Sequence, residues 1–299
     1  MQANTRILLI TYTDFFKPIT NLLGDNSGNT VYYTSGVSML YSKTLSTVFQ
    51  TTDKILKNLN NDINWARRNF DICIMMEANI FSEFYNNTML SNANLIKKLG
   101  IPTFVLGAGC QSTLDYSLNF LHNIKENSKR YIHAIKHSGG DITLRGEFTR
   151  HALEQIGCSD LFVSGCPSLF LLDRNFQMDI PKISKENFKP MLNAHLVSDI
   201  NEKIYKEFPD SIYFDQDIYF KALYFPSKVK DAHSLIYKNP FKKLYEENRI
   251  QGDMNYYMWR KQIKEGRFNF SYGSRIHGNI IAIQNNIPAF VKIVDSRTR

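Results

Sequence analysis

Two residues near the end of the chain, Arg275 and His277, have side chains that could bind an anion and move a proton. They stand two positions apart, where the apolar run FNFSYG gives way to the helical pattern of NIIAIQNN. At such a strand-to-helix junction both side chains can face one side, whereas in mid-helix they would diverge. The start of a helix attracts anions, and a histidine titrates near neutral pH. The pair therefore predicts an anion site with one titratable group; the alternative is that His277 is a structural histidine.

The residues next to this pair belong to the same predicted site. Ser274 is predicted to be the N-cap of the helix. Gly278 and Asn279 lie in the first helical turn, where backbone N–H groups could hold a phosphate.

Three polar residues follow the next predicted strand, in the sequence DSR. Asp295, Ser296 and Arg297 lie at the strand's end and could support the same site. The alternative is that Asp295 and Arg297 pair with each other or steady a domain interface.

A further arginine stands at another strand end, in the sequence TLRGE. Arg145 closes an apolar strand pattern and precedes a helical one. An arginine in that position can form a bidentate pair with a carboxylate or phosphate, which a lysine cannot. The alternative is an ion pair, either with Glu147, two residues further on, or at a domain surface.

A glycine-rich segment follows the first predicted strand. Gly24 allows close approach of the backbone to an anion, and Asp25 and Asn26 could bind sugar hydroxyls. The alternative is an ordinary loop of turn residues. Cys166, in VSGCPSLF, has no histidine neighbour in the sequence, so we predict a turn there in preference to a thiol nucleophile.

These residues need a scaffold of alternating strands and helices, which is the pattern of an α/β protein. The segment 170–190 loses this regularity, so we expect one domain over residues 1–175, a second over 185–299, and a cleft between them. In open parallel sheets, ligands bind beyond the carboxyl ends of the strands. Helices are predicted from the glycine-rich loop onward and at 89–99, 123–137, 146–157 and after 274. Strands are predicted at 7–12, 71–76, 101–107, 141–145, 161–165, 190–197, 211–217, 268–273 and from 287.

Composition narrows the class of partner. The formal net charge of +8 over 299 residues suits anionic partners, but the basic residues are spread along the chain and no nucleic-acid motif occurs, so we expect no nucleic acid. The four cysteines show no CxxC spacing, which argues against a metal site and indicates a reducing, cytoplasmic compartment. No apolar run approaches the roughly 18 residues of a membrane span.

Five sequence blocks occur in an order that resembles the polysaccharide pyruvyl transferase family. They are GDN at 24–26, VLGAGCQ, TLRGEFTRHALEQIG, VSGCPSLF and GSRIHGNIIAIQNNIPAFVKIVDSRT. The similarity covers almost the whole chain and is weakest over 172–265. One departure concerns the first block, because the family's Asn-x-Gly-Asp is one residue longer here.

The resemblance implies two Rossmann-like domains facing a cleft, as in GT-B glycosyltransferases. It implies transfer of the enolpyruvyl unit of phosphoenolpyruvate to a sugar of a cell-surface polysaccharide (capsule or exopolysaccharide) or of its lipid-linked precursor, with formation of a pyruvate ketal and release of phosphate. Arg145, Arg275 and His277 would carry the donor site, and Asp25 and Asn26 would face the acceptor. No metal or other cofactor is expected.

The enzyme would be cytoplasmic and could contact the inner membrane face. Relatives usually continue past this point with a helix that returns to the first domain; a trimmed chain and a naturally short variant both stay open. Two other functions stay open: a glycosyltransferase of the same architecture that uses a nucleotide sugar, and a catalytically idle glycan-binding protein. The aromatic residues between Tyr213 and Tyr257 could form an acceptor platform or belong to the core.

Overall fold

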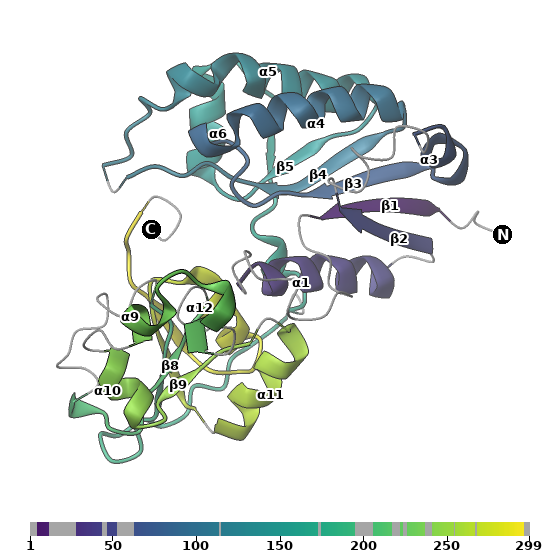
Figure 1. Cartoon of the computed structure of the whole chain (residues 1–299). Coiled ribbons are helices and arrows are strands. Elements are labelled where there is room, and N and C mark those ends of the chain that lie inside the picture. Colours follow the sequence, from purple (N-terminus) through teal and green to yellow (C-terminus); the bar gives the residue numbers. More distant parts are fainter. Residues whose placement is uncertain are drawn as a thin grey trace.

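The computed structural model contains two parallel β-sheets with helices packed along them (Figure 1). It describes residues 5–11, 28–43, 47–52, 63–113, 115–172, 175–194, 206–216, 222–223, 226–236, 241–253, 255–266 and 268–295. No helix among these residues combines the length and the hydropathy needed to cross a bilayer.

The first sheet has six parallel strands in the order β2-β1-β3-β4-β5-β6. The strands are β1 (Arg6–Thr11), β2 (Thr47–Thr52), β3 (Ile72–Met76), β4 (Thr103–Ala108), β5 (Ile142–Leu144) and β6 (Phe162–Val163). The five strands predicted in this part of the chain are confirmed within a few residues. β2 was not predicted, because its sequence TVFQTT is too polar to stand out as a buried strand.

Helices cover both faces of this sheet, which is why its strands other than β2 are nearly continuous apolar runs. They are α1 (Gly28–Lys43), α3 (Ile63–Asn69), α4 (Asn86–Leu99), α5 (Leu121–His137) and α6 (Glu147–Gln155). Leu8 and Ile10 of β1 pack with α4 and α5, whereas Ile7 and Leu9 point to the opposite face, toward Tyr32 of α1. Figure 1 shows α4 and α5 above the sheet and α1 beneath it.

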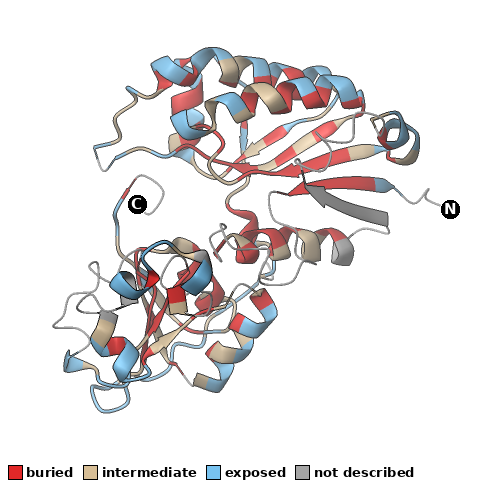
Figure 2. Ribbon diagram, in the orientation of Figure 1, coloured by how far each residue is buried: buried red, intermediate tan, exposed pale blue. Residues whose placement is uncertain are grey.

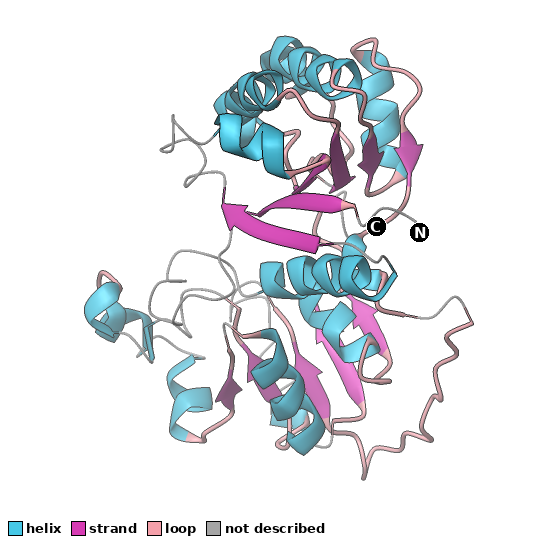
Figure 3. Ribbon diagram, turned by 90° about the vertical axis from the view of Figure 1, so that its right-hand side faces the viewer, coloured by secondary structure: helices cyan, strands magenta, loops and turns pink. Residues whose placement is uncertain are grey.

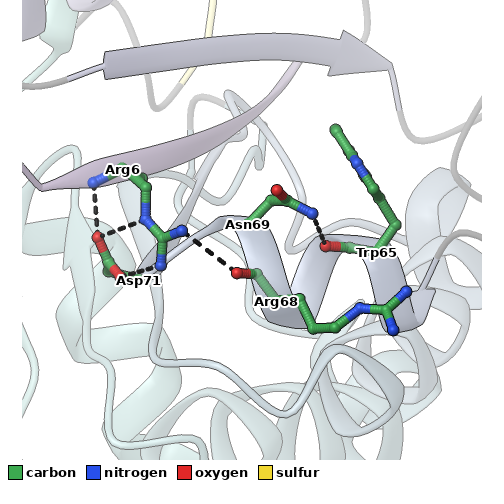
Figure 4. A network of polar contacts seen from close by, with 5 residues as sticks. All are labelled: Arg6, Trp65, Arg68, Asn69 and Asp71. Atoms are coloured by element: carbon green, nitrogen blue, oxygen red, sulfur yellow. Dashed lines mark hydrogen bonds and ion pairs between the residues drawn. The ribbon is translucent and has the colours of Figure 1, made fainter.

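Local signals position these elements as the sequence indicates. Gly100 ends α4 in a left-handed conformation (φ +60°), and its N–H bonds to the carbonyl of Ile96. At the same, amino-terminal edge of the sheet, the guanidinium of Arg6 forms an ion pair of 2.7 Å with Asp71, and its Nη1 donates to the carbonyl of Arg68 (Figure 4). These contacts fasten the start of β1 to the end of α3.

The second sheet has five parallel strands in the order β11-β10-β7-β8-β9. The strands are β7 (Pro190–Leu192), β8 (Ile212–Phe214), β9 (Ile250–Gln251), β10 (Phe270–Gly273) and β11 (Ala289–Val291). The helices of this half are α9 (Ala232–Ile236), α10 (Phe241–Glu246), α11 (Tyr256–Gly266) and α12 (Ile276–Ile283). Both sheets and their flanking helices are visible in Figure 3. The core of this second half holds Trp259, whose ring stacks on that of Phe214 with 6.4 Å between the ring centroids.

Tyr213 and Tyr256 are also buried in this half, so the interpretation of these two as core residues is correct. Three short 3-10 helices complete the described elements: η2 (Glu83–Tyr85), η3 (Pro167–Leu169) and η5 (Pro226–Lys228).

Helix α1 joins the two halves of the molecule. It lies between the two sheets, and most of it is buried or partly buried (Figure 2). Its Val31 belongs to the core of the second sheet, although Tyr32 and Tyr33 pack on the first. Gln284, which follows α12, donates to Ser35 Oγ at 3.0 Å and to the carbonyl of Ser168. The predicted α/β class with parallel sheets is confirmed, while the domain limits 1–175 and 185–299 stay a prediction.

Candidate functional site

The turn between β10 and α12 is shaped by a glycine. Gly273 has φ +151°, and a Cβ there would lie 2.0 Å from the carbonyl oxygen of Asn193, so only glycine fits. The N–H of Arg275 donates to that same oxygen at 2.8 Å. The prediction of Ser274 as N-cap is wrong: the N-cap is Arg275, whose backbone is extended, and no side chain caps the helix. Ser274 is instead buried one residue earlier.

Buried polar contacts hold the first turn of α12. Asn279 Nδ2 donates to the carbonyls of Gly273 and Arg275, both at 3.0 Å, and its Oδ1 accepts from Ser271 Oγ at 2.8 Å. Gly278 packs so closely that a Cβ would lie 2.3 Å from both Asn193 Oδ1 and Gln216 Nε2. Arg275 and His277 therefore sit on a rigid support, and substrate contact by Ser274, Gly278 and Asn279 stays a prediction.

His277 is 9% exposed and approaches a residue that the sequence does not place near it. Its Nε2 lies 3.9 Å from Cys166 Sγ, and that sulfur lies 2.8 Å from Ser168 Oγ. Cys166 thus has a histidine neighbour in space, 111 residues away in sequence. It remains a turn residue before η3, as predicted, but it also contacts the candidate site.

Arg145 ends β5 with its backbone N–H bonded to the carbonyl of Ala108 at 2.8 Å. Its Nε and Nη2 atoms are buried, and neither has a hydrogen-bond acceptor within the described part of the chain. The alternative of an ion pair with Glu147 is wrong, because Glu147 pairs with Arg150 at 2.6 Å. Buried donors nearly always have partners in folded proteins, so an anion is one partner that could bind these two nitrogen atoms.

The ring of Tyr32 of α1 lies close to both Arg145 and His277. Its ring is 5.1 Å from Arg145 Cζ and 6.1 Å, between centroids, from the His277 ring. Its hydroxyl donates to the carbonyl of Leu106 at 2.6 Å. Burial raises the pKa of the Tyr32 phenol far above its ordinary value, so the ring stays neutral. Sequence reasoning missed Tyr32, whose only signal was an aromatic pair in the helix after the glycine-rich loop.

Two cavities open at the carboxyl ends of the first sheet. The first, the Arg145 cavity, has a volume of about 740 Å³ and is lined by Arg145, His151, Glu147 and Phe148 among others. The second has about 780 Å³ and is lined by η2, by the segments after β3 and β4, and by Val294 and Asp295. We call it the η2 cavity.

Asp295 lies in the η2 cavity and not against Arg145. It is buried, and its Oδ2 accepts from Gln111 Nε2 at 3.4 Å. The structure thus brings Arg145 and His277 to one tyrosine ring and places Asp295 beside a different cavity. Five predicted site residues lie outside the described residues: Gly24, Asp25, Asn26, Ser296 and Arg297. Within the described ranges, no three His, Cys, Asp or Glu side chains are grouped in a way that could hold a metal ion.

The chain is similar to one known protein family and to solved structures. A family model described as polysaccharide pyruvyl transferase matches residues 39–296. A solved structure titled "S. aureus MnaA-UDP co-structure" matches with a TM-score of 0.50 and 12% identity, over 98% of this chain and 80% of that one. A substrate binding protein of Clostridium difficile, CD0873, matches with a TM-score of 0.24 and 13% identity, over 96% and 74% of the two chains. Among curated proteins, no match is found.

Proposed function

The chain belongs to the polysaccharide pyruvyl transferase family, and we propose that it transfers the enolpyruvyl unit of phosphoenolpyruvate to a glycan. The acceptor is a sugar of a cell-surface polysaccharide or of its lipid-linked precursor, and the product is a pyruvate ketal. The observation that carries the donor assignment is the guanidinium of Arg145, with two buried N–H donors that have no acceptor among the described residues.

Phosphoenolpyruvate carries a carboxylate and a phosphate on a small frame, so a site for it needs converging cationic groups. Arg145 supplies one, and an arginine can bind either anion through two parallel hydrogen bonds. Arg275 and the backbone N–H groups at the start of α12 supply the other. Tyr32 supports this arrangement because its neutral ring packs against the Arg145 cation and beside His277.

The chemistry begins with a proton added to the methylene carbon, which leaves C2 electron-poor. One acceptor hydroxyl attacks C2 and gives its proton to the group that protonated the methylene carbon, which restores the acid. A second hydroxyl of the same sugar then attacks C2, the C2–O bond to phosphate breaks, and the departing phosphate takes the second proton. His277 is the candidate acid, since a histidinium can donate near neutral pH, and such help is worth roughly 100- to 10,000-fold in rate.

The fold is compatible with a donor site between two Rossmann-like domains in a GT-B-like arrangement. In each sheet the strand order reverses once, between β1 and β3 in the first and between β7 and β10 in the second. Ligands of open α/β sheets bind at such points, beyond the carboxyl ends of the strands. Arg275 and His277 follow β10, at the reversal of the second sheet. We propose a cytoplasmic enzyme that can work at the inner membrane face.

The test measures phosphate release from phosphoenolpyruvate in the presence of galactose, mannose and glucose acceptors. Acceptor-dependent release supports the proposal. Consumption of a UDP- or GDP-sugar without phosphoenolpyruvate turnover would contradict it and favour a glycosyltransferase.

Calorimetry then tests the residue roles. We expect Arg145→Ala and Arg275→Ala each to weaken phosphoenolpyruvate binding by about 1.5–3 kcal/mol, the scale of charged hydrogen bonds. Arg130→Ala is the matched control, since Arg130 is exposed on α5 and lines neither cavity, so the affinity should stay unchanged. His277→Gln should lower turnover more than affinity. A loss of affinity alone would make His277 a binding group.

A further inference from the structure

We propose that the η2 cavity binds an uncharged sugar unit of the acceptor glycan, an inference that rests on the proposed transferase function. The cavity lies where the first sheet's strands end: Asn79 follows β3 and Gln111 follows β4. This is the edge at which open parallel sheets bind ligands. Its volume of about 780 Å³ falls within the roughly 300–1,000 Å³ of small-molecule sites.

The charges of the cavity select a neutral ligand. Among its described lining residues, Glu83 and Asp295 carry the side chains that are charged at neutral pH, and no lysine, arginine or histidine lines it there. A phosphate or carboxylate would be repelled. Sugar hydroxyls suit this lining because they donate to carboxylate and amide oxygens and accept from amide, serine and threonine donors. The Arg145 cavity holds an arginine and a histidine beside Glu147, whose carboxylate pairs with Arg150, so it suits an anion better.

An aromatic side chain at the cavity offers a surface for a sugar ring. Phe84 is 86% exposed although it is a large apolar residue. Its ring meets Tyr85 edge-to-face at 4.8 Å, which orients it without covering it. The C–H face of a sugar stacked on Phe84 would remove apolar surface from water, at about 25 cal/mol per Å². Phe120 also lines the cavity. A polar wall beside an exposed aromatic ring suits a ligand with hydroxyl edges and an apolar face.

The polar wall is held in place before any ligand binds. Glu83 Oε1 accepts from Asn123 Nδ2 at 2.6 Å, and the carbonyl of Asn123 accepts from Asn86 Nδ2 at 3.0 Å. These bonds fasten η2 to the start of α5. On the other side, the 3.4 Å contact of Gln111 with Asp295 joins the first half of the chain to the second. A preorganised wall loses less conformational freedom on binding.

The η2 cavity adjoins the candidate donor site across one residue, Gly109. A Cβ on Gly109 would lie 2.8 Å from the carbonyl oxygen of Ala78, 3.6 Å from Asn79 Oδ1 and 3.7 Å from Arg145 Cβ. Asn79 lines the η2 cavity, and Gly109 and Arg145 line the other. A sugar in the η2 cavity would therefore sit beside a donor on Arg145. Reaction requires the sugar hydroxyl to approach C2 of the donor to about 3–3.5 Å.

The experiment observes sugar binding directly, by saturation-transfer NMR with methyl galactoside, methyl mannoside and methyl glucoside. The wild-type chain should bind at least one of them, and Phe84→Ala and Glu83→Gln should weaken that binding at least tenfold. Phe162→Ala is the matched control, because Phe162 is 67% exposed on β6 and lines neither cavity. It should bind as the wild type does. Exposed Phe84 makes little packing contact, so thermal stability should be unchanged.

Binding that survives unchanged in both Phe84→Ala and Glu83→Gln would overturn the acceptor site, as would the absence of binding by the wild type. Calorimetry with phosphoenolpyruvate on the same variants separates this result from the transferase function. Phosphoenolpyruvate affinity should be the same in all of them, since none touches Arg145. If sugar binds at Phe84 but phosphoenolpyruvate does not bind at all, the sugar site stands and the donor assignment fails.

Discussion

Gly278 is the position where one added methyl group should do most damage to the candidate site. In Gly278→Ala the new Cβ would lie 2.3 Å from Asn193 Oδ1 and 2.3 Å from Gln216 Nε2. Both partners are buried and are bonded to each other at 3.3 Å. Asn193 also donates to Ser271 Oγ at 2.9 Å. Because neither side chain can move without losing a buried hydrogen bond, the substitution must disturb the support of α12.

The size of the effect follows from three contributions. Overpacking a close contact costs about 1–3 kcal/mol. A buried hydrogen bond broken on one side costs about 1–3 kcal/mol more. Alanine gains about 1 kcal/mol over glycine in a helix, which offsets part of this. We expect Gly278→Ala to lower the free energy of unfolding by about 3 kcal/mol.

Urea unfolding followed by tryptophan fluorescence suits this test, because Trp259 is fully buried in the core of the second sheet. Gly146→Ala is the matched control: a Cβ there meets nothing within 4 Å. Gly146→Ala should lower the free energy of unfolding by less than about 1 kcal/mol, the scale of a changed N-cap. If the two variants were equally stable, the close packing of α12 against Asn193 and Gln216 would be wrong. Phosphoenolpyruvate affinity should also fall in Gly278→Ala, since the carbonyl of Asn193 holds the N–H of Arg275.

Two further predictions concern stability. Tyr131→Phe should lower the free energy of unfolding in urea by about 1–3 kcal/mol, because it removes the hydroxyl that donates to the buried Glu77 Oε2 at 2.7 Å. The exposed Tyr245→Phe should lower it by less than about 0.5 kcal/mol. Equal losses in the two variants would argue against the buried hydrogen bond to Glu77. Burial raises the pKa of the Cys110 thiol to about 12, from an ordinary value near 9. Above pH 9 the unfolded chain therefore loses this proton while the folded chain keeps it, so stability should fall with rising pH until about 12, by about 1.4 kcal/mol per pH unit for this thiol. Cys110→Ala should flatten the alkaline stability profile by that slope, and an unchanged profile would show that the thiol is not held protonated.

Much of the scaffold could be predicted from the sequence because its signals are local. The apolar runs of β1, β3, β4 and β10, the helical periodicity of α4, α5 and α6, and the stop at Gly100 depend on residues close together in the chain. β2 and β9 were missed because TVFQTT is largely polar and β9 spans only two residues. Each of these two strands forms because it pairs with a neighbouring strand, and its own sequence pattern does not predict it.

By itself, the sequence determined the α/β class, the strand-turn-helix unit that carries Arg275 and His277, and the family. Only the tertiary structure decided what these residues meet. It places Tyr32 close to both Arg145 and His277, gives Cys166 a histidine neighbour, pairs Glu147 with Arg150 instead of Arg145, and places Asp295 in a second cavity with Phe84. The physical reason is that these contacts join segments far apart in sequence across two sheets. Local periodicity sets which face of an element is apolar, but packing sets which polar side chains converge at its edge.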